Sequence, residues 1–445
     1  DTNRPTFTSV HGKGAKVVHL KDLALEKFID QTALDNVPHL EAAIQEPKTV
    51  LLTGANGFLG HIVCLKWLEK LAKVDGKLIC IVRATDHQAA KQRLDKEFEG
   101  LDTDFETSYK KLAEKHLEVL AGDISEPLLG LDSETYNRLA LEVDRICHVA
   151  ALVNHRLAYQ HLFGPNVVGT SEIIRLAISQ QKKAIDFIST VGVQPFLDKS
   201  KENNEAAPLK TNVKLSTRYA AGYGTSKWAG EYLLQQANEK WGLTCNIFRC
   251  DMILPDQHYK GQFNTEDVLT RLLYSVVTTG LAPKSFYQIP ANGSQANAHY
   301  DGVPVDVLSD MIIGLCLGGK NECRTFNAQN YLTANISLDS FVDWLESAGY
   351  ELHRIDDHAT WYERMENKLK SLPETQRQRS MIDIMAAYSR PYSTDFVSPD
   401  CSNFEALAKF VNGGEGIPTL SEVYIHKYLK DMVLLGLIDA PVLVE

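Results

Sequence analysis

Residues 49–60 read TVLLTGANGFLG, an apolar run that leads directly into a glycine-rich turn and then into a helical stretch. A strand, a turn of this kind and a helix in succession are typical of dinucleotide-binding βα units, although a plain turn that tolerates glycine has the same appearance. Gly54 permits the tight turn, Gly57 lets a pyrophosphate approach backbone N–H groups at the positive helix end, and Gly60 allows close helix–strand packing. The expected dinucleotide contacts are Thr53, Gly54, Asn56, Gly57, Phe58, Leu59 and Gly60.

Strand-like and helical runs alternate after this turn, which predicts a Rossmann-type, doubly wound parallel sheet covered by helices on both faces. The expected strands are 50–52, 77–82, 117–120, 145–149, 184–189 and 245–248, with helices over 109–116, 167–179 and 227–240 between them. Beyond residue 255 helical runs dominate, at 305–317, 338–348 and 361–372. They predict a smaller, mainly helical C-terminal lobe that binds substrate.

These patterns give three expected segments. Residues 1–46 read as a leader that packs on the surface, with one amphipathic stretch at 23–34. Residues 47–255 form the nucleotide-binding domain, and 256–445 form the C-terminal lobe, from which some strands return to the sheet. The polar stretch 198–217 is too long for an ordinary connection and is expected to be a mobile functional loop or a disordered one.

Composition narrows the class of protein. The 445 residues carry 46 Lys+Arg against 57 Asp+Glu, a net charge of −11 that gives no general attraction to nucleic acid or anionic lipid. The eight cysteines form no CxxC pair and lie mostly in apolar runs, as buried thiols of a cytoplasmic protein do. No apolar run is long enough to span a membrane, the polar start is no signal peptide, and the histidines lack metal-ligand spacing. The missing initial Met suggests a piece of a longer polypeptide.

The end of the second strand bears on which cofactor is preferred. A protein that prefers NAD usually places an acid there to hold the ribose 2′-OH, whereas this chain has Arg83. A cation at this place favours a 2′-phosphate, and Arg93 is a second candidate for the same phosphate unless both are solvated surface charges. Asp123, after the third strand, is expected either to accept from the adenine amine or to cap the next helix. Further cofactor contacts are expected at Ile124, Ala150 and Ala151.

Tyr223 and Lys227 lie four residues apart, which places a phenol and an ammonium on one face of a helix. A nearby Lys⁺ favours phenolate, so we expect it to lower the pKa of Tyr223 toward the working pH and to let the tyrosine exchange a proton with a substrate oxygen. Thr190 ends a strand at the carboxyl edge of the sheet, where ligands bind in open α/β folds. It is the expected hydroxyl partner, and Ser189 is its rival.

TGANGFLG, DFISTVGV and YGTSK, in this order and spacing, resemble the motifs of the extended short-chain dehydrogenase/reductase family. The segments VLLTGANGFLG, KLICIVRA, LVNHRLAYQHLFGPNVVGT, GYGTSKWAGEYLL, FRCDMIL and AHYDGVPV resemble, more closely, the C-terminal thioester reductase domain of carboxylic acid reductases. This resemblance covers nearly the whole chain, including HLKDLALEKFID, which in the family leads from the carrier domain. The family's Tyr, Lys and hydroxyl fall on Tyr223, Lys227 and Thr190.

The resemblance implies NADPH-dependent reduction of an acyl thioester, carried on the phosphopantetheine arm of a carrier domain, to an aldehyde and a free thiol. Thr190 and Tyr223 would donate hydrogen bonds to the oxyanion, and Lys227 would hold the nicotinamide ribose. Asn166 would support the lysine through water, and Ser189 would lie beside the cofactor. Asp251 is a candidate for tuning the position of the substrate or a loop, unless it makes a structural hydrogen bond only. Lys210, Lys214 and Arg218 are candidates for contact with the arm phosphate or an acidic carrier helix, unless they are solvated charges.

Two other interpretations of the sequence compete with this one. A sugar-nucleotide epimerase or dehydratase has the same fold, but Arg83 and the helical C-terminal lobe disfavour it. A catalytically silent scaffold that senses nucleotides would typically lack the pair formed by Tyr223 and Lys227.

Overall fold

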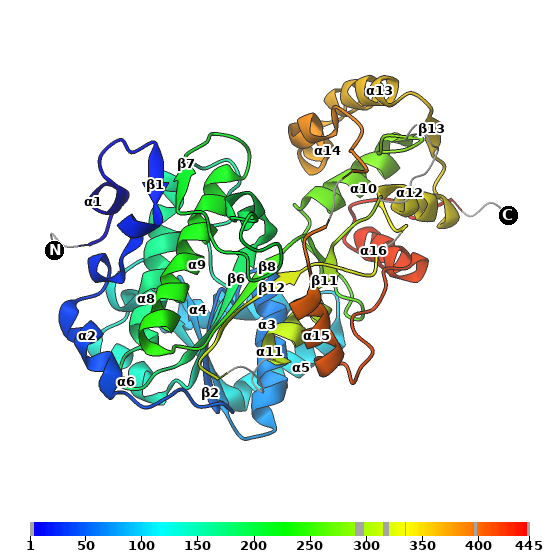
Figure 1. Cartoon of the computed structure of the whole chain (residues 1–445). Coiled ribbons are helices and arrows are strands. Elements are labelled where there is room, and N and C mark those ends of the chain that lie inside the picture. The colour runs from blue at the N-terminus through cyan, green and yellow to red at the C-terminus, as the bar shows by residue number, and fades with distance from the viewer. Residues whose placement is uncertain (1–3, 290–297, 315–319, 334, 396–397, 443–445) are drawn as a thin grey trace. The chain divides into compact units, whose positions relative to one another are not determined.

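The computed structural model describes residues 4–289, 298–314, 320–333, 335–395 and 398–442 (Figure 1). Its contacts divide the chain into one unit of residues 1–253, 305–329 and 399–416, and a second of 254–304, 330–398 and 417–445. The ranges expected from the sequence, 47–255 and 256–445, differ from this division because the chain returns twice to the first unit. The first return carries a strand of the main sheet.

The first unit is built on a parallel sheet. Among the described residues seven strands pair in the order β12-β8-β6-β5-β2-β3-β4. They are β2 (Thr49–Thr53), β3 (Lys77–Val82), β4 (Leu117–Ala121), β5 (Arg145–His148), β6 (Ala184–Thr190), β8 (Cys245–Cys250) and β12 (Cys323–Ala328). The order reverses at β2, with β3 on one side and β5 on the other, and the carboxyl ends of strands at such a reversal are where doubly wound folds bind ligands. The predicted fold class is confirmed.

Helices cover both faces of this sheet (Figure 1). On one face α3 (Phe58–Ala72) packs against α5 (Thr103–His116) and α11 (Val305–Gly314), and α11 packs against α15 (Ser402–Val411). On the other face α8 (Gly169–Ala177) packs against α9 (Ala221–Trp241). This unit also contains α4 (His87–Asp95), α6 (Ser133–Glu142) and α7 (Tyr159–Leu162).

The second unit is mainly helical. It contains α10 (Val268–Thr279), α12 (Leu338–Ser347), α13 (His358–Lys370), α14 (Glu374–Arg379) and α16 (Glu422–Leu434). In it β10 (Leu281–Pro283) pairs in parallel with β13 (His353–Ile355). The short strands β9 (Ile253–Leu254) and β11 (Val303–Pro304) lie where the chain passes from one unit to the other.

The cysteines of the described ranges are free thiols. Cys64, Cys80, Cys147, Cys245 and Cys250 are buried, and Cys323 and Cys401 are half-buried. Cys316 lies outside the described residues, as do residues 315–317 of the helix expected over 305–317.

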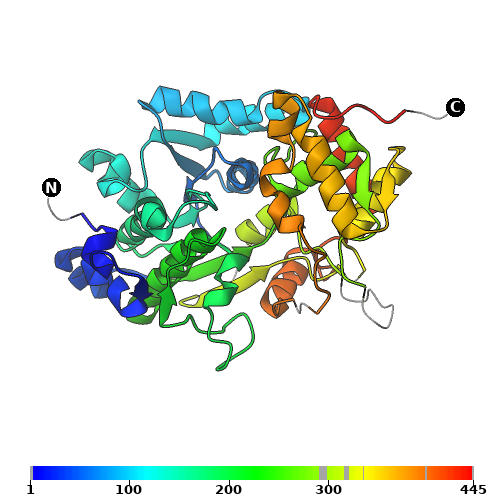
Figure 2. The same ribbon diagram turned by 90° about the horizontal axis from the view of Figure 1, so that it is seen from above.

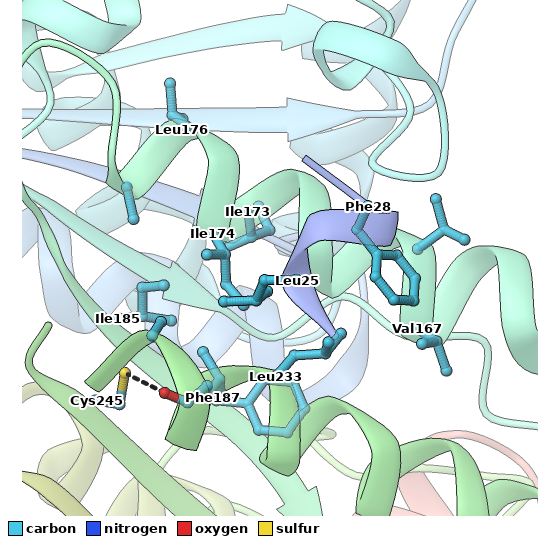
Figure 3. Packing of buried hydrophobic residues seen from close by; sticks show 14 of the residues in the cluster. Leu25, Phe28, Val167, Ile173, Ile174, Leu176, Ile185, Phe187, Leu233 and Cys245 are labelled. Carbon is cyan, nitrogen blue, oxygen red and sulfur yellow. Dashed lines mark hydrogen bonds between the residues drawn. The ribbon is translucent and has the colours of Figure 1, made fainter. Parts of the chain in front are cut away.

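The N-terminal segment is more than the surface leader expected from the sequence. It forms α1 (Phe7–His11), β1 (Val17–His19) and α2 (Gln31–Asn36), and it lies against α8 and α9 in both views (Figures 1 and 2). Leu25 and Phe28 belong to the same buried cluster as Ile174 of α8 and Leu233 of α9 (Figure 3). Its apolar side chains therefore complete the core of the first unit.

The stretch 198–217 also differs from the mobile or disordered loop that we expected. Residues Asn212–Lys214 form β7, which pairs antiparallel with β1. The buried Glu205 carboxylate accepts a hydrogen bond from the backbone N–H of Asn327, at 2.6 Å, and another from that of Asn403. Strand pairing and the hydrogen bonds of a buried carboxylate thus hold this stretch in place, which its polar composition did not predict.

Replacing Leu25 with alanine tests whether the N-terminal segment is part of the core. Leu25 is fully buried, so Leu25→Ala is expected to lower the free energy of unfolding by about 2–5 kcal/mol in urea titrations. Ile44→Ala is the control, because Ile44 is 41% exposed and its loss is expected to change stability by about 0.5 kcal/mol or less. Equal small effects from both variants would show that residues 1–46 are a dispensable leader.

Candidate active site

The glycine turn lies where the strand order reverses. Gly54 has a φ of +77°, and a Cβ placed on it would come within 2.6 Å of the Ala150 nitrogen. A Cβ on Gly60 would lie 1.7 Å from the Gly54 carbonyl oxygen, whereas one on Gly57 would meet only that oxygen at 3.5 Å. Two glycines are therefore fixed by packing, and Gly57 is free to serve a ligand.

The start of α3 fits a phosphate. Gly57 is its N-cap residue and supplies no side-chain oxygen to the first backbone N–H groups of the helix. Gly57 is exposed and Asn56 and Phe58 are half-buried around it, while Leu59 is buried in the core. Open N–H groups at a positive helix end are the usual cradle for a pyrophosphate.

Thr53 has a structural use at this turn. Its hydroxyl lies 2.7 Å from Nδ1 of His148 and accepts a hydrogen bond from the Ala150 N–H at 3.1 Å, which ties β2 to the end of β5. Burial lowers the pKa of His148 to about 3, so this imidazole is neutral. Ala150 and Ala151 follow β5 and are half-buried at the same edge of the sheet.

The two arginines proposed for phosphate binding meet at the end of β3. Arg83 and Arg93 are both exposed, and the Arg93 guanidinium donates to the Arg83 carbonyl oxygen at 2.6 Å. The Asp123 carboxylate accepts from the backbone N–H and the hydroxyl of Ser125 at 2.9 and 2.7 Å, so it stabilises the turn after β4. The side chain of Ile124 packs against Gly169 of α8.

Tyr223 and Lys227 lie on the face of α9 that meets β6. The Lys227 ammonium is 5.8 Å from the centroid of the Tyr223 ring. It donates to the Ile188 carbonyl oxygen at 2.8 Å and lies 4.7 Å from the centroid of the Phe187 ring. The exposed fractions are 9% for Tyr223 and 3% for Lys227, so both groups are largely shielded from water.

The pKa shifts of this pair correct one expectation. Burial raises the pKa of Tyr223 above its ordinary value, although we expected the lysine to lower it. Burial likewise lowers the pKa of Lys227 to about 8, and the proximity of Cys250 and Glu231 opposes that shift only in part. Desolvation is the largest cause of both shifts, so the phenol is neutral and able to donate a proton.

Ser189 and Thr190 have different environments. The Ser189 hydroxyl is buried and donates to the Glu231 carboxylate at 2.6 Å, and that carboxylate is paired with the Arg249 guanidinium at 2.7 Å. Thr190 is half-buried, and its hydroxyl accepts from the Gly192 N–H at 3.0 Å. The 3₁₀ turn Val191–Phe196 packs on the start of α9, where a Cβ on Gly224 would lie 2.7 Å from the Gly192 carbonyl oxygen. This packing brings the end of β6 next to Tyr223.

Asn166 lies in a π-helix, Phe163–Val168, beside this pair. Its carboxamide accepts from the Leu152 N–H at 2.8 Å and donates to the Leu152 carbonyl oxygen at 3.1 Å. It also donates to the Ser226 hydroxyl at 3.0 Å. Asn166 therefore joins the loop after β5 to α9.

The other candidates lie on three segments. The Asp251 carboxylate, just after β8, accepts from the Gln329 amide at 3.0 Å and from the Met252 N–H at 2.9 Å. The Lys210 ammonium donates to the Pro195 carbonyl oxygen at 2.8 Å, which places this lysine beside the turn that follows Thr190. Lys214 and Arg218 are exposed, the former in β7 and the latter before α9.

Sequence reasoning missed three features of the site. The pairing of Glu231 with Arg249 joins side chains 18 residues apart and was signalled only by two charges in otherwise apolar runs. The π-helix has no sequence signal that we recognise. His155 packs its ring edge-to-face against Tyr223 at 5.2 Å, a contact that follows from the path of the loop. None of the described helices combines the length and the apolar character needed to cross a membrane.

The fold and the glycine turn define a nucleotide-binding protein of the short-chain dehydrogenase/reductase type. The sequence profile of the NAD-binding family described as male sterility protein matches residues 52–312. The match covers more than half of the chain, which therefore belongs to this family and takes a nicotinamide cofactor.

Relatives narrow this assignment. The chain is 45% identical over 442 residues to the carboxylic acid reductase of Segniliparus rugosus and 41% identical over 449 residues to that of Mycobacterium tuberculosis. Both matches cover 98% of this chain but only 37% and 38% of the relatives, so the chain spans less than two fifths of their length.

Solved structures agree with this result. The reductase (R) domain of a nonribosomal peptide synthetase from Mycobacterium tuberculosis has a TM-score of 0.87 and 39% identity, covering 95% of this chain and 100% of that one. The resemblance to thioester reductase domains is thereby confirmed. A UDP-glucuronic acid 4-epimerase from Bacillus cereus has a TM-score of 0.51 and 16% identity over 87% of this chain and 99% of its own, a likeness of fold alone.

Alanine at two glycines separates the packing role of the turn from its ligand role. Gly60→Ala forces a Cβ into backbone and is expected to lower the free energy of unfolding by about 3 kcal/mol. Gly57→Ala makes only an ordinary contact, so its stability is expected to change by less than about 1 kcal/mol, while its affinity for the nicotinamide dinucleotide falls about 10-fold. Thermal unfolding and fluorescence titration measure the two effects. A Gly60→Ala protein as stable as the wild type would contradict this account of the turn.

Proposed function

We propose that this chain reduces a phosphopantetheine-bound acyl thioester to an aldehyde, with release of the free thiol and use of NADPH. The observation that carries the proposal is the buried pair of Tyr223 and Lys227 at the carboxyl edge of the sheet, in a chain closely similar to reductase domains. The relatives' names, carboxylic acid reductase and nonribosomal peptide synthetase, support the thioester as the substrate class.

The site residues have distinct roles in this reaction. The bound nicotinamide supplies a hydride to the thioester carbonyl carbon. The hydroxyls of Thr190 and Tyr223 donate hydrogen bonds to the oxygen that becomes negative, and preorganised donors in a dry site stabilise such charge strongly. Tyr223 then gives this oxygen its proton, forming a hemithioacetal whose C–S bond breaks to leave aldehyde and thiol. The raised pKa of Tyr223 suits this step because the tyrosine must arrive protonated.

Ser189 is the weaker candidate for the catalytic hydroxyl. Its proton is donated to the buried Glu231 carboxylate, whereas the Thr190 hydroxyl accepts one hydrogen bond and keeps its own proton for another partner. We therefore assign the role to Thr190. Lys227, already held by the Ile188 carbonyl oxygen, has two further N–H groups for the nicotinamide ribose.

Arg83 and Arg93 are the proposed readers of the 2′-phosphate. Both are exposed at the end of β3, and the hydrogen bond between them holds the two guanidinium-bearing segments together. Asp123 follows the end of the neighbouring strand β4, and its carboxylate accepts a hydrogen bond from Ser125. It therefore stabilises the turn where we place the adenine.

The proposed partner is a carrier domain that presents the thioester. The lengths of the relatives, of which this chain spans less than two fifths, leave ample chain for such a domain. Lys214 and Arg218 are exposed, so we propose that they meet the phosphate of the arm or an acidic carrier surface. Lys210 is less available because its ammonium is bonded to Pro195.

Reduction that stops at the aldehyde requires a feature of the site that prevents a second hydride transfer, because an aldehyde is intrinsically more electrophilic than a thioester. The stretch 198–217, which we expected to be mobile or disordered, is already held by strand β7 and Glu205. A control on the second reduction would therefore lie closer to the cofactor. Asp251 is the proposed element, since its bond to Gln329 joins the ends of β8 and β12.

Arg83→Ala tests the cofactor assignment. Loss of a charge-assisted phosphate contact costs about 1.5–3 kcal/mol, so the KM for NADPH is expected to rise roughly 10- to 150-fold while that for NADH changes little. Steady-state rates with each cofactor measure this difference. The control is Lys111→Ala, which removes an exposed cation on α5. Equal effects of Arg83→Ala on both cofactors would show that Arg83 does not bind the 2′-phosphate.

Tyr223→Phe tests the proposed proton donor. With hexanoyl-pantetheine and NADPH, the turnover is expected to fall about 10²- to 10⁴-fold while NADPH affinity stays within about 2-fold, because the lost contact is to charge that develops during reaction. The matched control is Tyr232→Phe, a half-buried tyrosine on the same helix. If Tyr223→Phe keeps near-normal turnover, Tyr223 is not the donor.

A further inference from the structure

Three exposed apolar side chains lie on two chain segments that meet at His155, whose ring packs against Tyr223. Leu152 and Val153 are 38% and 61% exposed and lie in the loop 151–158, which we name the His155 loop. Tyr219, 61% exposed, lies in the turn that precedes α9. Exposed apolar side chains that gather in one place mark binding surfaces more often than scattered ones do.

His155 joins these two segments. Its ring lies 5.4 Å from the Tyr219 ring and 5.2 Å from the Tyr223 ring, the latter at an interplanar angle of 87°. Its carbonyl oxygen accepts from the Ala220 N–H at 2.8 Å. The imidazole therefore separates an exposed tyrosine from the catalytic one and contacts both.

The His155 loop is held at both ends. At its start, the Asn166 carboxamide bonds both the N–H and the carbonyl of Leu152. Toward its end, the loop approaches α9 so closely that a Cβ on Gly222 would lie 2.4 Å from the Leu157 carbonyl oxygen. The three apolar side chains are thus presented by a backbone fixed against the catalytic helix.

The His155 ring is held by packing. Within the described residues its Nδ1 is buried and has no hydrogen-bond partner, while its two ring neighbours are aromatic. Burial also lowers its pKa, so the ring is neutral and suited to an apolar surrounding. These observations describe a spacer between rings rather than an acid or a base.

We propose that Leu152, Val153 and Tyr219 bind the hydrocarbon chain of the acyl group, and that His155 is the positioning residue that holds Tyr219 beside Tyr223. This inference rests on the proposed function, which places the thioester carbonyl at the Tyr223 hydroxyl. The phosphopantetheine arm is polar, with amides and a phosphate, whereas these three side chains offer it no charge. Exposed Arg156 in the His155 loop and exposed Arg218, next to Tyr219 in sequence, suit the arm's phosphate instead.

The test is the dependence of KM on acyl length, measured with acetyl-, butanoyl-, hexanoyl- and octanoyl-pantetheine. Each buried CH₂ contributes about 0.8 kcal/mol, so the wild-type KM is expected to fall roughly 2- to 4-fold per added methylene. Tyr219→Ala and Val153→Ser are expected to reduce the ratio of acetyl to octanoyl KM by about 10-fold. The matched control is Leu141→Ala on α6, where Leu141 is 65% exposed and its loss is expected to leave that ratio unchanged.

Two variants of His155 test its positioning role. Phenylalanine keeps a ring and loses the nitrogens, so His155→Phe is expected to retain the wild-type KM profile. His155→Ala is expected to raise the octanoyl KM more than the acetyl KM. If His155→Phe is as impaired as His155→Ala, the nitrogens matter and the spacer role is wrong.

A binding measurement separates this inference from the proposed function. Calorimetric titration with octanoyl-pantetheine needs no turnover, and its Kd is expected to rise about 10-fold in Tyr219→Ala. If the protein reduces no thioester but octanoyl-pantetheine still binds more weakly to Tyr219→Ala than to the wild type, the proposed reaction is refuted and the proposed acyl-binding surface is retained. Unchanged octanoyl KM and Kd in both Tyr219→Ala and Val153→Ser would overturn the surface while leaving thioester reduction intact.

Discussion

The burial of the Lys227 ammonium is the constraint on which the active-site half of the first unit depends. A charge shielded from water is costly unless polar groups surround it, and this one has the Ile188 carbonyl oxygen at 2.8 Å and the face of the Phe187 ring at 4.7 Å. Both partners belong to β6, so this strand and α9 must keep one fixed relation. Burial lowers the pKa of Lys227 to about 8, so these contacts compensate only part of the cost of removing the ammonium from water.

The face of α9 that carries Lys227 also carries Tyr223 and Glu231. Tyr223, Lys227 and Glu231 follow at intervals of four residues, and Glu231 is satisfied by Arg249 of β8 and by the Ser189 hydroxyl. One face of the helix therefore carries a phenol, then an ammonium group, and then a carboxylate that is paired with a guanidinium. The Ser189 hydroxyl is engaged by Glu231, which leaves the hydroxyl of Thr190, the last residue of β6, as the one that we propose for the reaction.

The sequence predicted those features that short-range patterns determine. The strand expected over 77–82 has those bounds in the structure, and the glycine turn leads from β2 into a helix, as expected. Contacts between distant segments have no such pattern in the sequence. Strand β1 pairs with β7 almost 200 residues later, and β12 joins the main sheet after residues 254–304 of the second unit have intervened. The direction of the Tyr223 pKa shift also escaped prediction, because it depends on burial, which spacing along a helix does not reveal.

Hydride transfer to the thioester carbon is the central claim, and isotope transfer tests it most directly. NADPH carrying two deuterium atoms at C4 of the nicotinamide would be mixed with hexanoyl-pantetheine and a stoichiometric amount of protein, and the products analysed by mass spectrometry and thiol titration. The account predicts hexanal with one deuterium on its carbonyl carbon and one free thiol for each NADPH consumed. Thiol released without NADPH consumption, or hexanal without deuterium, would contradict it.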